Sequence, residues 1–198
     1  MSPPPTSSEH TADSRAVRAA LRRERLAARM ALDEAAHAAL SSRIEAHLAA
    51  LLESVPARSL AFCAPVRGEF DARPLAARLI GRGWRAAMPV VVAAGAPMEF
   101  RGWTPDAEMA LDRHGIPIPS GGVAPAPELL LLPLVAFDAR GFRLGYGGGY
   151  FDRTLAAMVP RPLAVGVGYE LGRVADTHPA AHDIALDALV TEAGVFRP

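Results

Sequence analysis

Lysine is missing from this chain, so all 21 of its Lys and Arg positions are arginine. This absence excludes every mechanism that depends on a lysine amine, such as a Schiff base or the lysine of a Walker-type phosphate loop. Cysteine is nearly missing as well: Cys63 is the only one in the sequence. A chain with one cysteine forms no internal disulfide and no multi-cysteine metal site. We expect Cys63 to be a buried strand residue in a protein of the reducing cytoplasm.

The chain also lacks a net charge and a long hydrophobic run. Its 21 basic and 21 acidic residues balance, so no overall field favours nucleic acid or an anionic membrane. Any anion site must therefore be local. The most apolar run ends at Phe137, contains Pro133 and is far shorter than the ~20 residues of a membrane span. We expect no nucleic-acid partner and no membrane segment.

The first 53 residues predict a tail and two helices. Residues 1–13 are rich in Pro, Ser and Thr, which indicates a disordered tail ahead of a single domain over residues 14–198. From about Asp13 to Glu53, apolar residues recur at helical spacing, and the two helices should meet near Asp33, a residue suited to an N-cap.

An arginine stripe marks the first helix. Arg18, Arg22, Arg25 and Arg29 follow one another at steps of four, three and four and so share one face. Such a stripe is usually solvated, but it can also lean over a phosphate, and the sequence leaves both readings open.

The rest of the chain predicts an α/β fold. Asp71 is suited to cap a helix that ends near Gly81 or Gly83, and Gly115 to Pro119 reads as an extended connection. Short apolar segments separated by helical or loop patterns predict a mostly parallel sheet flanked by helices. Ligands of such sheets bind beyond the carboxyl ends of the strands, where Glu69 lies. The predicted strands are Ser59–Ala64, Arg85–Val92, Met98–Trp103, Leu129–Leu132, Leu163–Gly168 and Ala188–Thr191.

Glycines, aromatics and charges concentrate between Arg143 and Arg153, just after the most apolar strand. Gly145 and the triplet Gly147 to Gly149 allow consecutive N–H groups to converge on an anion. A helix over Tyr150 to Met158 would aim its N-terminus at the same place. The spacing matches neither the dinucleotide-binding G-x-G-x-x-G nor a Walker loop. The segment therefore predicts a phosphate site of another kind.

A second candidate site lies near the C-terminus. Asp183 is suited to Mg²⁺, which takes one or two carboxylates and fills its remaining positions with water and phosphate oxygens. The alternative, in which Asp183 and Asp187 only shape a turn, stays open. Zinc is disfavoured, because Pro179 disturbs the spacing of the neighbouring histidines and no third soft ligand is evident.

Two segments resemble the signature of the 5-formyltetrahydrofolate cyclo-ligases: Leu132 to Asp138, and Arg143 to Arg153. The similarity extends from about Arg15 onward, through Arg18 to Arg22, Gly68 to Asp71, Gly115 to Pro119 and His182-Asp183. It implies a three-layer, Rossmann-like sandwich. It also implies conversion of 5-formyltetrahydrofolate to 5,10-methenyltetrahydrofolate with ATP as co-substrate and Mg²⁺ as cofactor, through a phosphorylated formyl intermediate.

The resemblance also assigns roles to residues. Glu69 and Tyr150 would bind the folate, Asp152 and Asp183 would hold Mg²⁺, and Arg143 and Tyr150 would be catalytic. Residues of two segments would bind ATP, namely Arg18, Arg22, Arg143, Leu144, Gly145, Tyr146, Gly147, Gly148, Gly149, Tyr150 and Phe151. Arg18 stands where lysine is usual, and Gly148 replaces a lysine found in some relatives; the planar guanidinium of Arg18 can dock differently on a phosphate.

From this resemblance we expect a cytoplasmic monomer that binds ATP and 5-formyltetrahydrofolate with or without a polyglutamate tail. Two other functions remain as alternatives. One is a non-catalytic paralogue that binds folate or nucleotide. The other is a phosphosugar or CoA-transfer enzyme on a related scaffold, with Glu69 as base or nucleophile, but it leaves the matches of Asp152 and Asp183 unexplained.

Overall fold

The computed structural model of the protein describes residues 7–198, with side chains from residue 14 onward. Helix α1 (Ser7–Met30) begins within the segment for which a disordered tail is predicted, and it includes residues 7–13. No proline lies between Pro5 and Pro56, and an existing helix gains one hydrogen bond for each residue that it adds. The other part of the predicted tail, residues 1–6, lies outside the described residues.

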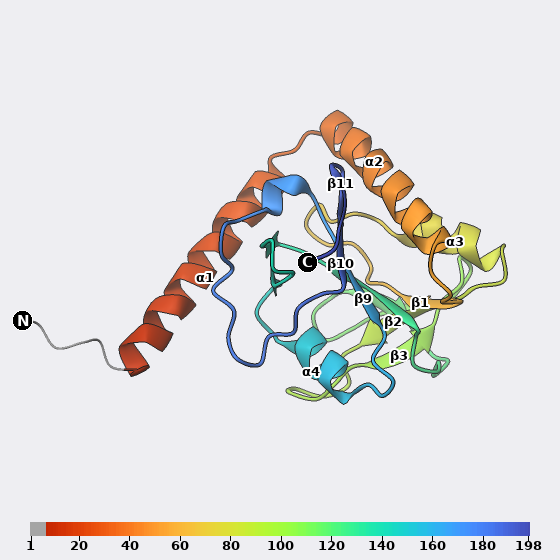
Figure 1. Cartoon of the computed structure of the whole chain (residues 1–198). Coiled ribbons are helices and arrows are strands. Elements are labelled where there is room, and N and C mark those ends of the chain that lie inside the picture. Colours follow the sequence, from red (N-terminus) through yellow and green to blue (C-terminus); the bar gives the residue numbers. More distant parts are fainter. Residues whose placement is uncertain (1–6) are drawn as a thin grey trace, which may run out of the picture.

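Helix α1 is followed by α2 (Glu34–Glu53), and the two helices meet at an angle (Figure 1). The other helical elements are α3 (Arg73–Ile80), α4 (Tyr150–Ala157) and the 3₁₀ turn η1 (Glu170–Gly172). The strands are β1 (Ser59–Ala61), β2 (Arg85–Val90), β3 (Glu99–Gly102), β4 (Met109–Leu111), β5 (Pro117–Pro119), β6 (Leu129–Pro133), β7 (Ala136–Phe137), β8 (Arg143–Leu144), β9 (Leu163–Val167), β10 (Ala188–Thr191) and β11 (Gly194–Phe196).

One seven-stranded sheet has the order β11-β10-β9-β6-β1-β2-β3. The inner pairs from β10 to β2 are parallel. The edge strands β11 and β3 pair antiparallel with their neighbours. The predicted mostly parallel α/β sheet is thus confirmed.

Helices cover the two faces of this sheet (Figure 1). Leu129 and Leu131 of β6 belong to the apolar cluster that contains residues of α2 and α3, whereas Leu130 and Leu132 pack in the cluster that contains Leu155 of α4. Side chains of a strand alternate between faces, so an unbroken run of leucines is expected where both faces are buried. The layers are therefore helix, sheet and helix, as the predicted sandwich requires.

The order in which the chain adds strands to the sheet reverses at β1. The next strand, β2, lies on one side of β1, and β6 lies on the other. Open α/β sheets bind ligands beyond the carboxyl ends of the strands at such a reversal. The loop that contains Glu69 follows β1, and the β7–β8 hairpin that leads into the glycine-rich segment follows β6.

The predicted helix ends are largely confirmed. Asp33 caps α2 and accepts a hydrogen bond from the Ala36 N–H at 2.7 Å, and α3 ends at a C-cap on Gly81. Asp71 lies one residue before the N-cap of α3, which is Ala72, and accepts a hydrogen bond from the Arg73 N–H at 3.0 Å.

A second, two-stranded sheet corrects the expectation of a plain extended connection near Gly115. Strands β4 and β5 pair antiparallel, with Ala110 opposite Ile118. The two prolines of β5 lie on either side of Ile118. Their missing N–H groups would point away from β4, so the hydrogen bonds between the two strands do not require them.

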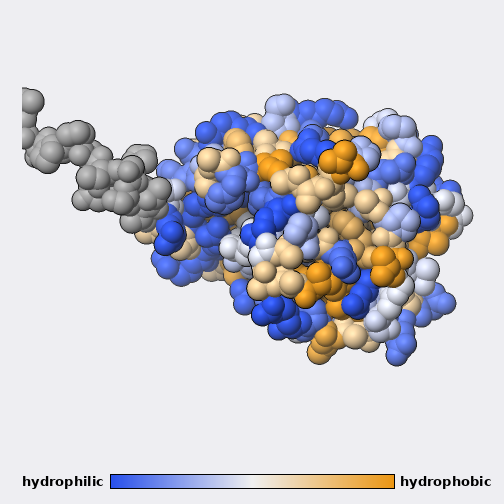
Figure 2. Space-filling view, turned by 90° about the horizontal axis from the view of Figure 1, so that it is seen from below, coloured by the Kyte–Doolittle hydropathy of each residue, from blue (hydrophilic) through white to orange (hydrophobic). Residues whose placement is uncertain are grey.

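The surface is mixed. Viewed from the side of α4, hydrophobic residues form several small patches scattered among hydrophilic residues (Figure 2). Apolar atoms supply more than half of the accessible surface of most folded proteins, so such patches are ordinary. Among the described residues, no helix combines the length and the apolar character needed to cross a membrane.

Candidate active site

The glycine-rich loop runs from β8 to the N-terminus of α4. Gly147 has φ 97° and Gly149, the N-cap of α4, has φ 64°, conformations that favour glycine. The described part of the chain shows no hydrogen bond from the N–H groups of Gly145 to Gly149 outside its regular elements. With the first N–H groups of α4, they form a row of donors suited to an anion. Leu144 is buried, so it can offer the site only its main chain.

Two arginines bind the carbonyls of this loop. Arg22 Nε donates to Gly145 O at 2.8 Å, and Arg153 Nη2 donates to Gly148 O at 2.6 Å. Burial and the neighbouring Arg18 charge lower the pKa of Arg22, but an arginine keeps its proton throughout the physiological range. Positive charge therefore lies beside the free N–H groups of the loop.

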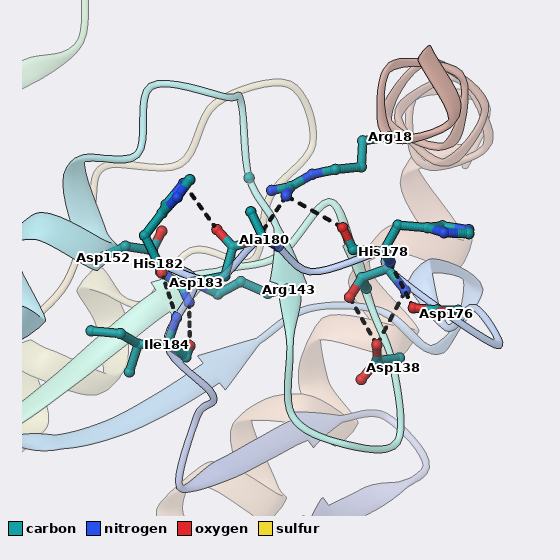
Figure 3. Close-up of polar contacts among 12 residues, drawn as sticks. Arg18, Asp138, Arg143, Asp152, Asp176, His178, Ala180, His182, Asp183 and Ile184 are labelled. Atoms are coloured by element: carbon teal, nitrogen blue, oxygen red, sulfur yellow. Dashed lines mark hydrogen bonds and ion pairs between the residues drawn. The ribbon is translucent and has the colours of Figure 1, made fainter. Parts of the chain in front are cut away.

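The two predicted metal ligands lie on adjoining segments (Figure 3). Asp152 Oδ1 accepts from the Ile184 N–H at 3.0 Å, and Asp183, the residue before Ile184, accepts through Oδ2 from Arg18 Nη1 at 2.8 Å. The Ala180 N–H also donates to Asp183 Oδ2, at 2.8 Å. Within the described residues these hydrogen bonds use one oxygen of each carboxylate. The second oxygen of Asp152 has no such bond, and Asp183 Oδ1 lies 3.8 Å from His182 Nε2, beyond hydrogen-bond distance, so both remain open to a cation. Two carboxylates beside a loop with free N–H groups are a donor set that fits Mg²⁺.

Arg143 contacts Asp152 and the main chain at Ile184. Its guanidinium is nearly buried and donates to Asp152 Oδ1 at 3.0 Å and to Ile184 O at 2.9 Å. The structure therefore brings this predicted ATP-binding and catalytic residue onto a predicted metal ligand, where it fixes the carboxylate.

Glu69 lies at the other side of the loop, joined to it by Tyr146. The Tyr146 hydroxyl donates to Glu69 Oε1 at 2.8 Å, and the Val66 N–H donates to Oε2 at 3.0 Å. Burial raises the pKa of the Glu69 carboxyl, while these hydrogen bonds and the charges of Arg29 and Arg67 act in the opposite direction. Burial and the Glu69 charge also raise the pKa of Tyr146, so its hydroxyl remains a donor.

A narrow recess borders the Glu69 carboxylate. Its volume is about 20 Å³, room for roughly one water molecule. Its walls are mainly apolar and include Phe62, Phe70 and Pro133. Glu69 is the one charged residue among the described residues that line it.

Tyr150, predicted to contact both substrates, begins α4. The Arg153 guanidinium lies 5.0 Å from the centre of its ring, and the His114 ring lies 6.3 Å away in an edge-on orientation. The structure thus places Tyr150 beside the β4–β5 hairpin, and it is Tyr146 that reaches Glu69. A role for Tyr150 with either substrate stays a prediction.

The arginine stripe of α1 faces the protein. Its members donate to main-chain carbonyls of different loops: Arg18 to His178 O, Arg22 to Gly145 O, Arg25 to Leu171 O and Arg29 to Leu134 O. This settles the open alternative against a solvated stripe. Sequence reasoning gave Arg29 no role at the site, although it continues the face that carries Arg18 and Arg22.

Comparison with known proteins identifies the family. The family model described as the 5-formyltetrahydrofolate cyclo-ligase family matches residues 12–192. The 5-formyltetrahydrofolate cyclo-ligase of Escherichia coli K12 is 34% identical over 149 residues, which cover 72% of this chain and 82% of that protein. The enzyme of the same name from Haemophilus influenzae is 32% identical over 152 residues, or 73% and 81% of the two chains.

Solved structures agree. The NMR structure of Aquifex aeolicus 5,10-methenyltetrahydrofolate synthetase superposes with a TM-score of 0.79 at 30% identity, covering 91% of this chain and 92% of that one. A 5,10-methenyltetrahydrofolate synthetase from Mycoplasma pneumoniae, at 24% identity, shares the fold with a TM-score of 0.70 over 88% and 98% of the chains. The chain therefore belongs to the 5-formyltetrahydrofolate cyclo-ligase family.

Proposed function

We propose that this protein converts 5-formyltetrahydrofolate to 5,10-methenyltetrahydrofolate in a reaction that consumes ATP, requires Mg²⁺ and releases ADP and phosphate. The observation that supports this most strongly is the 2.8 Å hydrogen bond from Tyr146 of the glycine loop to Glu69. It joins the segment suited to phosphate with the carboxylate suited to the N–H groups of a folate ring. A phosphoryl transfer between two substrates requires such adjacent sites.

The nucleotide side is supplied by the loop and by α1. The free N–H groups of Gly145 to Gly149 and the N-terminus of α4 would bind the phosphates. Arg22 holds the loop through Gly145 O and adds positive charge. Arg18, now on Asp183, can pair with either that carboxylate or a phosphate.

Asp152 and Asp183 would hold Mg²⁺. When bound, the ion would neutralise phosphate charge and orient the phosphates for transfer. Arg143 fixes Asp152 from inside the protein, and the Ile184 N–H fixes the same oxygen. Arg143 would therefore act on catalysis through Asp152.

The folate side is supplied by Glu69, which would accept hydrogen bonds from ring N–H groups and place the formyl group toward the loop. The formyl oxygen then attacks the γ-phosphorus of ATP, and the bond to the bridging oxygen breaks to release ADP. N10 attacks the activated formyl carbon, the carbon–oxygen bond breaks, and phosphate leaves with the N10 proton. The loop N–H groups and Arg22 would stabilise the charge that spreads over the transferred group.

One assay tests this function. Purified protein is incubated with 5-formyltetrahydrofolate, ATP and Mg²⁺, and both methenyl product and ADP are measured. We expect the two products in equal amounts. Absence of both would overturn the proposal, and calorimetric binding of folate or nucleotide without turnover would instead support a non-catalytic relative.

A further inference from the structure

Arg29 occupies a buried position at the end of α1, with only 4% of its surface exposed. Its guanidinium reaches three separate segments: Nε donates to Arg67 O at 2.9 Å, Nη1 to Leu134 O at 2.8 Å and Nη2 to Tyr146 Oη at 2.7 Å. The same Nη2 lies 3.7 Å from Glu69 Oε1. A buried arginine is costly unless its donors are satisfied, and here each nitrogen has a partner.

The acceptor Arg67 O belongs to an unusual stretch of backbone. Arg67 has φ 49° and Gly68 has φ 72°, so two consecutive residues before Glu69 are left-handed. This conformation is unfavourable for an arginine, and it persists where surrounding contacts hold it. The hydrogen bond from Arg29 Nε is such a contact, and it fixes the loop immediately before Glu69.

The carboxylate of Glu69 has a defined orientation. Tyr146 Oη and the Val66 N–H occupy one position on each oxygen, whereas a carboxylate accepts about four hydrogen bonds. The remaining positions are therefore presented in a direction that the Arg29 and Tyr146 contacts determine.

We propose that Arg29 is a positioning residue for folate: it fixes Glu69 and the Tyr146 hydroxyl as one unit, so that the carboxylate is presented to the N–H groups of the folate ring. The inference rests on the proposed function, because it takes Glu69 as the folate-binding group. It assigns Arg29 no contact with the substrate. Arg29 acts through Glu69 and links the folate side to the glycine loop.

The charges around Glu69 make this testable by pH. Arg29 and Arg67 face the carboxylate as cations, and Tyr146 faces it as a neutral donor. Cys63 and Tyr169 also face it, and the Glu69 charge contributes to raising the pKa of both groups. Burial already raises the pKa of Glu69 and the Arg29 charge lowers it, so removing that charge should raise the pKa of Glu69 further.

The kinetic experiment compares Arg29→Met, Arg29→Lys and the control Arg25→Met. Arg25 lies on the same face of α1 and donates to Leu171 O at 3.2 Å, a carbonyl of another loop. We expect Arg29→Met to raise the folate KM roughly tenfold or more. The KM for ATP should change less than about twofold, and the acid limb of kcat/KM for folate should move to higher pH. Arg29→Lys should restore the acid limb, and Arg25→Met should leave it in place.

A second readout does not depend on turnover. In protein labelled with ¹³C at glutamate carboxyls, the Glu69 resonance is identified by its loss in Glu69→Gln and titrated in each variant. A higher Glu69 pKa in Arg29→Met supports the inference that Arg29 fixes the carboxylate. This readout does not depend on the proposed function, which is overturned separately if the wild-type protein makes no methenyl product. If Arg29→Met does not fold, Tyr146→Phe removes the other contact and should also raise the pKa. An unchanged Glu69 pKa, or loss of stability with equal rises of both KM values, would overturn the inference.

Discussion

The proposed magnesium site can be tested at Asp152 with an isosteric change. Asp152→Asn keeps Oδ1 as an acceptor for the Ile184 N–H and for Arg143, which lie 3.0 Å away, but removes the negative charge. We expect turnover to fall by more than about tenfold, equivalent to about 1.4 kcal/mol of lost transition-state stabilisation. The Mg²⁺ concentration for half-maximal rate should rise by a similar factor, because a neutral amide is a weaker ligand for this cation.

The cost to folding follows from the same contacts. A hydrogen bond to a charged group contributes about 1.5–3 kcal/mol and a neutral one about 0.5–1.5 kcal/mol, so the free energy of unfolding should fall by about 1–2 kcal/mol. That is a modest part of the stability of a domain of this size, and the variant should stay folded. Circular dichroism and urea unfolding measure this loss of unfolding free energy separately from the kinetics.

Asp138→Asn provides a control for neutralising an aspartate elsewhere in the chain. Asp138 is fully buried, whereas Asp152 is partly exposed, and Asp138 accepts from Arg140 Nη2 and from Thr177 Oγ1, each at 2.8 Å, in the neighbourhood shown in Figure 3. It has no place in the proposed metal site. Initial rates at fixed ATP and varied free Mg²⁺ should show a higher half-saturating concentration for Asp152→Asn and an unchanged one for Asp138→Asn. Equal Mg²⁺ dependence in both variants would refute Asp152 as a Mg²⁺ ligand. Its role would then be limited to its ion pair with Arg143.

Three further changes separate the folate side, the nucleotide side and the core. Glu69→Gln should raise the folate KM by about tenfold with little change in the ATP KM, since a charge-assisted acceptor is lost; a change in the ATP KM alone would contradict the assignment. Arg22→Met should raise the ATP KM by about tenfold or more and leave the folate KM nearly constant, because it frees Gly145 O and removes a positive charge beside the proposed phosphate site. Gly166→Ala in β9 should destabilise the fold by about 1–3 kcal/mol in urea unfolding, because the added Cβ would lie 2.6 Å from Leu186 Cδ1 and 2.9 Å from Leu189 Cδ2.

The sequence was most informative where a local pattern and the packing agree. The leucines of β6 and the cap at Asp33 could be predicted because burial on two faces and helix capping each leave a short-range signal. The β4–β5 hairpin was missed because prolines argue against a strand, and their alternation with Ile118 becomes meaningful only when the partner strand is known.

The candidate site could likewise be predicted only where a feature depends on local sequence. The glycine loop, Glu69 and the two aspartates could be singled out from residue type and resemblance. The hydrogen bond between Tyr146 and Glu69 spans 77 residues, and that between Arg29 and Leu134 spans 105, so no local pattern carries them. A tyrosine in a glycine-rich loop gives no indication that its hydroxyl contacts Glu69.

The arginines of α1 explain why one helix can organise loops that differ in sequence. Their partners include carbonyls of Gly145, Leu171, Leu134 and Arg67, and every residue carries a carbonyl. The specificity of these contacts therefore lies in the register of α1, not in the side chains of the loops. One inserted residue turns the rest of a helix by about 100° and would carry the arginines beyond it off their acceptors. The spacing of Arg22 and Arg29 on α1 is thus as much a part of the site as the glycine loop, because these two arginines fix the glycine loop and the loop before Glu69.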